Sequence, residues 1–133
     1  MVTFLSDRSE CRGLVTRVLI VDDEPGIVAS LRRTLRKEGW ELLTAAGPRE
    51  ALRLLQGGAV DMVVSDYQMP SMTGVELLAR VQERWPETVC VLISGWADSI
   101  NEQILREAGI RTMISKPWDD GELKATLRSF LTP

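Results

Sequence analysis

Five polar residues that could take part in chemistry follow four short apolar segments. They are Asp22 and Asp23, Asp66, Ser94 and Lys116. Carboxylates that lie close together repel one another, so they need a cation or protons. Oxygen ligands of this kind suit Mg²⁺, which is usually bound by one or two carboxylates with waters and a phosphate. An ammonium group can pair with a carboxylate or a phosphoryl oxygen, and a hydroxyl can hydrogen-bond an incoming oxygen. The set therefore favours chemistry at phosphorus.

The sequence contains no histidine. Its absence excludes Ser-His-Asp and Cys-His catalysis and every His-ligated metal site. Phosphoryl transfer is still open to the chain, because that reaction depends mainly on positioning and on neutralising charge. An ionised carboxylate is already a nucleophile and needs no general base to attack phosphorus and form an acyl phosphate.

The five residues can meet only if the segments before them are strands of one sheet. Short apolar runs predict five strands, and helical spacing of apolar residues predicts a helix after each. The predicted strands are 18–21, 40–45, 61–66, 88–93 and 112–115. This alternation predicts an α/β fold, a doubly wound (βα)5 sandwich of flavodoxin-like topology with a five-stranded parallel sheet and helices on both faces. The polar residues would then share the rim at the carboxyl ends of the strands.

Some finer features also follow from the pattern. The first strand should be buried on both faces and the second more exposed. Pro25 is expected in the first turn of a helix, capped by the acidic residue before it. Either Asp119 or Asp120 is expected to cap the last helix. A helix near 99–108 should turn three apolar side chains inward, namely Ile100, Ile104 and Leu105.

The chain of 133 residues has room for one domain, which we expect over 17–131 after a polar N-terminal tail over 1–16. The formal net charge of −3 argues against direct binding of nucleic acid. No apolar run approaches the roughly 18 residues that a membrane helix needs. Cys90 lies in an apolar run and is expected to be a small buried residue. This cysteine usage favours a cytoplasmic protein.

Each polar residue also has an ordinary structural interpretation. A single Asp after a strand is most often a turn former or a helix cap. Ser94 before Gly95 is typical of a turn, and Lys116 before Pro117 could be a solvated side chain. The functional interpretation depends on the conjunction, because each group follows a different strand of one predicted sheet.

Four motifs in this order give the chain a family resemblance. They are 18–25 (VLIVDDEP), 65–74 (SDYQMPSMTG), 92–95 (LISG) and 115–118 (SKPW). The chain from about Arg17 to Leu131 resembles a response-regulator receiver domain of two-component signal transduction, the CheY-like family. The resemblance implies that Asp66 is a phosphoacceptor loaded by a histidine kinase or phosphotransfer protein. It also implies a phosphoprotein rather than a turnover enzyme.

The resemblance implies a metal site as well. Asp23, Asp66 and the backbone carbonyl of Gln68 would hold Mg²⁺, with Mn²⁺ as the alternative ion, and Asp22 would act through metal-bound water. The remaining roles would fall to Lys116, which contacts the phosphoryl group, and Ser94, which moves toward it. The Lys116–Pro117 bond would be cis.

Receiver domains switch an output surface or an attached effector domain. A C-terminal effector domain would lie outside this chain, and members often form homodimers through the last two helices and the last strand. Many carry Tyr or Phe where this sequence has Met113, so a coupled hydroxyl–aromatic switch is not expected. Our hypothesis is that Trp96 and Gln68 set the lifetime of the phosphorylated state.

Two other classes remain open. One is an interaction module with the receiver fold that works without phosphorylation. The other is a small Mg²⁺-dependent aspartyl phosphatase of the haloacid-dehalogenase type. For that class Glu24 stands at the required spacing after Asp22, but Gly26 replaces the expected Thr or Val. Intact mass after treatment with acetyl phosphate and Mg²⁺ separates the classes.

Overall fold

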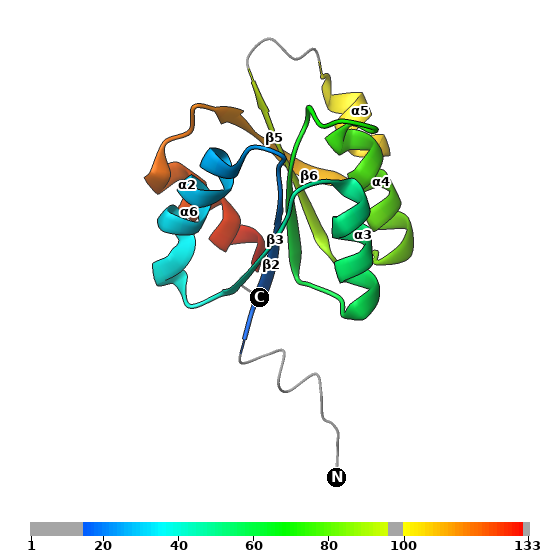
Figure 1. The fold of residues 1–133 in the computed structure, drawn as a ribbon. Helices are drawn as coiled ribbons and strands as arrows, with labels where there is room; N and C mark the ends of the chain where they lie inside the picture. The colour runs from blue at the N-terminus through cyan, green and yellow to red at the C-terminus, as the bar shows by residue number, and fades with distance from the viewer. Residues whose placement is uncertain (1–14, 96–99, 132–133) are drawn as a thin grey trace.

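The computed structural model describes residues 15–95 and 100–131. The described residues form one parallel sheet between two layers of helices (Figure 1). The strands are β2 (Arg17–Val21), β3 (Glu41–Ala45), β4 (Met62–Asp66), β5 (Val89–Gly95) and β6 (Ile110–Lys116). The helices are α2 (Pro25–Leu35), the 3-10 helix η1 (Arg36–Glu38), α3 (Pro48–Gly57), α4 (Gly74–Arg84), α5 (Glu102–Glu107) and α6 (Asp120–Leu131).

The predicted fold class is confirmed. The strand order is β3-β2-β4-β5-β6, and every neighbouring pair is parallel. The chain leaves β2 toward β3 on one side and later returns to place β4 on the other. The strand order therefore reverses beside β2, and loops that follow β2 and β4 diverge there, which opens a crevice at the carboxyl ends of the strands.

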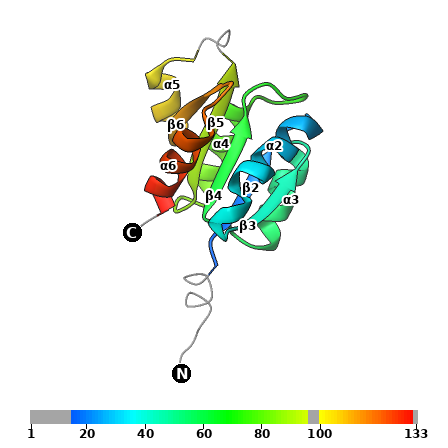
Figure 2. The ribbon, with the colours of Figure 1, turned by 90° about the vertical axis from the view of Figure 1, so that its left-hand side faces the viewer.

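Alternating side chains of the strands fill two separate cores. Val18 and Ile20 of β2 face α2 and α6, where they pack with Leu31 and Leu127. Leu19 belongs to the opposite core, which lies under α3, α4 and α5. Figures 1 and 2 show these two helical layers, with α2 and α6 together on one face. Because the central strands are buried on both faces, their apolar runs are continuous rather than alternating.

The predicted contrast between the first two strands is confirmed. β2 is buried over its last four residues, whereas β3 begins exposed and is fully buried only at Ala45. β3 is an edge strand, so it pairs on one side only. Cys90 is fully buried, as predicted, and burial raises the pKa of its thiol to about 12.

The start of α2 partly corrects the prediction. Pro25 does begin the helix, but the side chain of Glu24 makes no capping hydrogen bond. Instead, Oδ1 of Asp22 accepts the backbone N–H of Glu24 at 2.9 Å. The turn is thus stabilised from the residue at the end of the strand. At α6 the cap is Asp119, whose Oδ2 accepts the N–H of Glu122 at 2.9 Å.

The helix predicted near 99–108 is shorter than expected. α5 begins at Glu102, and the side chain of Asn101 caps it by accepting the N–H of Ile104 at 2.9 Å. Ile100 and Leu105 pack against the core, as predicted. The prediction is wrong for Ile104, which is 37% exposed. The later start leaves one six-residue helix, and Ile104 lies on its outer side.

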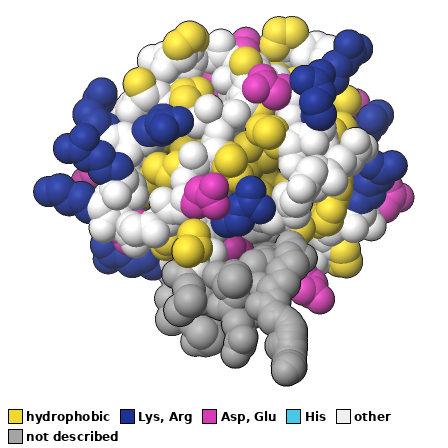
Figure 3. Space-filling view, turned by 60° about the horizontal axis from the view of Figure 1, so that its bottom comes forward, with side chains coloured by type: hydrophobic (Ala, Val, Ile, Leu, Met, Phe, Trp, Pro, Cys, Tyr) yellow, Lys and Arg dark blue, Asp and Glu magenta, His cyan; other side chains and the backbone are white. Residues whose placement is uncertain are grey.

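The surface carries charged side chains of both signs. Figure 3 shows Lys and Arg side chains on two sides of one face, interspersed with Asp and Glu. Within the described part of the chain, no helix is long and apolar enough to cross a bilayer.

Candidate functional site

Four neighbouring strands bring the predicted polar residues to one rim. Asp22 directly follows β2, Asp66 ends β4, Ser94 lies near the end of β5 and Lys116 ends β6. The register pairs Val21 with Ser65, Asp66 with Ile93 and Gly95 with Lys116. Strands in a sheet lie about 4.8 Å apart, so side chains at matched ends can meet.

Three carboxylates form an acidic cluster, defined as Asp22, Asp23 and Asp66. One carboxylate oxygen from each lies within 4.8 Å of the others. Asp22 and Asp66 are buried, whereas Asp23 is exposed. Hard oxygen donors that converge with one side open to water match the preference of Mg²⁺. The cluster therefore fits a magnesium ion.

The electrostatics show the cost of this arrangement without a cation. The pKa of Asp22 is raised from 3.8 to about 6. Burial is the largest cause, and the charges of Asp66 and Asp23 add to it, against the hydrogen bond from Glu24 and the charge of Lys116. A cation at the cluster would offset this unfavourable burial.

Lys116 supplies a positive charge to the cluster. Its Nζ lies 2.9 Å from Oδ1 of Asp66 and 4.0 Å from Oδ2 of Asp22. Burial alone lowers the pKa of the Lys116 ammonium, but its hydrogen bond to Asp66 and the nearby carboxylates outweigh burial and raise the pKa. The ammonium group thus stays charged and points at the residue predicted to react.

The remaining predicted residues lie around this centre. Ser94 is buried at the end of β5, and its Oγ donates a hydrogen bond to the carbonyl of Gly95 at 3.1 Å. Gln68 is exposed and lines a hollow with Asp23 and Tyr67. The Lys116–Pro117 bond is cis, as predicted. The predicted role of Trp96 falls outside the described residues.

Gly74 is a supporting residue whose importance the sequence analysis did not identify. It begins α4, and its N–H donates to the carbonyl of Tyr67 at 2.8 Å. A Cβ built at Gly74 would overlap the backbone carbonyl oxygen of Asp66 and lie 2.8 Å from Cδ1 of Leu92. Glycine therefore allows α4 to pack directly behind Asp66. The signal available in the sequence is the capping box of Thr73 and Glu76, which fixes the start of α4 at this glycine.

Met113 lies on β6, on the strand that Lys116 ends. It is partly buried and packs against the core under α3, α4 and α5. A flexible thioether fills such a gap in several rotamers. The position is therefore part of the packing between β6 and that core.

The fold and the rim define a doubly wound α/β protein with an acidic cluster and a lysine at the carboxyl ends of its strands. The family model of the response regulator receiver domain matches residues 18–128. The chain belongs to the response regulator receiver domain family.

Curated relatives agree. The hydrogenase transcriptional regulatory protein HoxA of Cupriavidus necator is 46% identical over 114 residues, which are 84% of this chain and 23% of HoxA. The sporulation initiation phosphotransferase F of Bacillus subtilis is 29% identical over 86% of this chain and 93% of its own length. The chain spans about a quarter of the length of the HoxA proteins that it matches.

Solved structures show the same fold. The receiver domain of an HD domain-containing protein from Pseudomonas fluorescens Pf-5 has a TM-score of 0.81 at 34% identity, covering 88% of this chain and 87% of that one. The chemotaxis protein CheY4 of Vibrio cholerae has a TM-score of 0.79 at 31% identity, covering 87% of this chain and 98% of that one. Receiver domains are generally phosphoacceptors that bind Mg²⁺ in an acidic pocket and work with histidine kinases.

Proposed function

We propose that Asp66 accepts a phosphoryl group from a histidine kinase or phosphotransfer protein in a Mg²⁺-dependent reaction. The observation that carries this proposal is the placement of Asp66, which lies 2.9 Å from the ammonium of Lys116 and within the acidic cluster. A buried carboxylate between a cationic side chain and converging oxygen donors is suited to nucleophilic attack on phosphorus.

In the proposed reaction, a carboxylate oxygen of Asp66 forms a bond to phosphorus. The bond between phosphorus and the donor nitrogen breaks, and the donor histidine leaves with that electron pair. Lys116 is placed to meet negative charge on a phosphoryl oxygen, since its ammonium already contacts Asp66. In hydrolysis, water would attack phosphorus, the bond between phosphorus and the Asp66 oxygen would break, and inorganic phosphate would leave the free carboxylate behind.

The ligands proposed for Mg²⁺ are Asp23, Asp66 and the backbone carbonyl of Gln68, with Asp22 acting through a bound water. Two observations support these different roles for Asp23 and Asp22. Asp23 is open to solvent, whereas Oδ1 of Asp22 already accepts a hydrogen bond from the backbone N–H of Glu24. When bound, Mg²⁺ would neutralise the charge of the cluster and of the phosphoryl group.

Ser94 is proposed to move toward the phosphoryl group and so report phosphorylation to an output surface. Its burial beside the last strand supports this role, because Ser94 pairs in register with Ser115 of β6. Met113, two residues earlier on β6, would respond by repacking rather than by moving an aromatic ring.

The lifetime of the phosphorylated state is proposed to depend on Gln68 and Trp96. Gln68 stands two residues after Asp66 and lines the hollow beside Asp23, where a hydrolytic water could enter. Gln68→Ala should change the dephosphorylation rate while leaving the phosphorylation site unchanged. Equal decay in the variant and the wild type would remove Gln68 from the proposal.

We further propose that 17–131 is the receiver unit, that it acts in the cytoplasm and that it controls an effector domain in a longer regulator. Its relatives include transcriptional regulators several times longer than the matched segment. The output would be carried by that effector domain or by a homodimer of the regulator.

The test is incubation with acetyl phosphate and Mg²⁺, followed by intact mass. We expect the addition of one phosphoryl group, lost in Asp66→Asn. Asp119→Asn is the matched control, because Asn also caps helices and position 119 lies outside the acidic cluster. No addition to the wild-type protein would favour the interaction module, and steady release of phosphate from general monoesters would favour the phosphatase.

A further inference from the structure

One carboxylate oxygen connects α2, α6 and the loop that follows Lys116. Oδ1 of Asp120 accepts a hydrogen bond from Nε1 of Trp118 at 3.1 Å. The same oxygen accepts a hydrogen bond from Oγ1 of Thr34 at 3.2 Å. Thr34 lies on α2, Trp118 in the loop after β6, and Asp120 begins α6. We call these three residues the rim latch.

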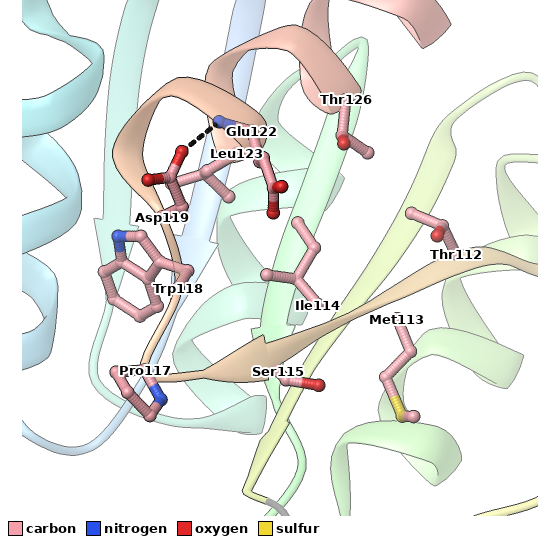
Figure 4. A pocket seen from close by; sticks show the side chains of 10 residues that line it. All are labelled: Thr112, Met113, Ile114, Ser115, Pro117, Trp118, Asp119, Glu122, Leu123 and Thr126. Atoms are coloured by element: carbon pink, nitrogen blue, oxygen red, sulfur yellow. Dashed lines mark hydrogen bonds between the residues drawn. The ribbon is translucent and has the colours of Figure 1, made fainter.

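The rim latch holds the loop that directly follows Lys116. β6 is an edge strand, so the sheet supports Lys116 only from the side of β5. In Figure 4 the ring of Trp118 extends to one side of this loop and Ser115 to the other. The indole also packs against the core under α2 and α6. The latch therefore supplies, from α2, the support that the sheet does not.

The rim latch connects the helix that follows the acidic cluster with the loop that follows Lys116. α2 begins two residues after Asp23, and Thr34 lies near the other end of that helix. Ile27 of α2, Lys116 and Trp118 line one hollow. A movement of the loop away from α2 would therefore move the ammonium of Lys116 relative to the acidic cluster.

We propose that the rim latch positions Lys116 so that its ammonium group engages Asp66 rather than Asp22. Both carboxylates lie within reach of Nζ of Lys116, with Oδ1 of Asp66 at 2.9 Å and Oδ2 of Asp22 at 4.0 Å. Phosphoryl transfer is sensitive to such differences because the charge must be in place when the bond to phosphorus forms. This inference rests on the proposed function.

A second contact, between η1 and α6, provides an internal control. There Arg128 binds Glu38 with two hydrogen bonds, at 2.6 Å and 2.7 Å. Both contacts hold α6 against the first helical segments, but the rim latch contains Trp118 and Asp120, which line one hollow with Lys116. A general loosening of α2 from α6 is therefore distinguishable from a loss of position at the rim.

The experiment measures the initial rate of phosphorylation by acetyl phosphate at saturating Mg²⁺, together with Mg²⁺ affinity. Thr34→Val and Trp118→Phe each remove one donor and retain most of the side-chain volume. We expect a threefold to tenfold slower rate in each, about the effect of one hydrogen bond, with unchanged Mg²⁺ affinity. Thr34→Ser should restore the rate, and Glu38→Gln should leave it at the wild-type value.

A second measurement separates positioning from general stability. In a Lys116→Met background, Thr34→Val should cause no further loss, since the group that it positions is gone. Wild-type rates in both latch variants, or an equal further loss without Lys116, would overturn the inference. If the wild type is phosphorylated and the latch variants react at the same rate, the proposal for the latch is wrong but the proposed function stands. If the wild type is not phosphorylated, the proposed function is wrong as well.

Discussion

The ammonium group of Lys116 and the carboxylate of Asp66 form the shortest ion pair of the rim, with Nζ 2.9 Å from Oδ1. The two residues lie 50 positions apart in the sequence and end β6 and β4, two strands separated by β5. The pair therefore spans the middle strand of this half of the sheet. It places a fixed positive charge at the proposed acceptor.

Replacing Lys116 should slow the phosphorylation of Asp66. Lys116→Met keeps most of the length of the side chain but leaves Asp66 and Asp22 without their cation. We expect phosphorylation by acetyl phosphate to fall by about 100-fold, the typical loss for one electrostatic contact in a reaction centre. Intact mass over time measures the rate. Retention of the wild-type rate would contradict the role of Lys116, and Lys124→Met on α6 is the matched control.

Mg²⁺ should stabilise the folded protein. The acidic cluster exists only when β2 and β4 are paired, so an ion that binds there binds the folded state and raises the thermal midpoint by mass action. At a concentration about 100 times the dissociation constant the gain is about 2.7 kcal/mol. Thermal unfolding in EDTA and in increasing Mg²⁺ measures the shift. Asp23→Ala should abolish the response, and a response that persists would place the ion elsewhere.

Asp22 should make the metal-free protein less stable as pH rises. Its pKa of about 6 in the folded state exceeds the ordinary value of 3.8, so the folded state binds the proton more tightly than the unfolded chain. The free energy of unfolding should therefore decrease from about pH 4 to pH 6, and the full cost remains above pH 6. Asp22→Asn should remove this cost and stabilise the EDTA-treated protein at pH 8 by about 1–3 kcal/mol. Denaturant unfolding at pH 4 and pH 8 measures the difference, which should nearly vanish at pH 4.

Gly74→Ala should disturb the acceptor from behind. The added methyl group meets the backbone carbonyl of Asp66 and the side chain of Leu92, both of which are buried. We expect a loss of about 1–3 kcal/mol in the free energy of unfolding, as for other overpacked sites, together with slower phosphorylation. Gly26→Ala is the matched control, since a Cβ there meets nothing within 4 Å. Equal stability of the two variants would contradict the proposed contact.

The fold and the rim were predictable because they depend on patterns that are local in sequence. Continuous apolar runs mark the buried strands, and the rule that parallel strands end at one edge brings Asp22, Asp66, Ser94 and Lys116 together. Strand ends shifted by at most two residues between prediction and structure, as for β6, which is longer than predicted at both ends. Such shifts did not change which residues reach the rim.

The features that the sequence did not predict depend on tertiary contacts. Thr34 and Asp120 lie 86 positions apart, and their hydrogen bond follows from the packing of α2 beside α6 rather than from any motif. The cap expected from Glu24 failed because Asp22, already held at the strand end, reaches the same turn. Ile104 is exposed because α5 is too short to bury every apolar side chain in its segment.

The non-sequential strand order has a consequence for the time at which the chemistry becomes available. A nascent chain emerging from the ribosome would carry its aspartates before the last strand of the sheet, because Asp66 ends β4 whereas Lys116 ends β6. Until β6 docks on β5, the acceptor lacks its ammonium partner. The competence to receive a phosphoryl group would thus arise only after β6 has been synthesised and has docked, in a molecule whose sheet is fully assembled.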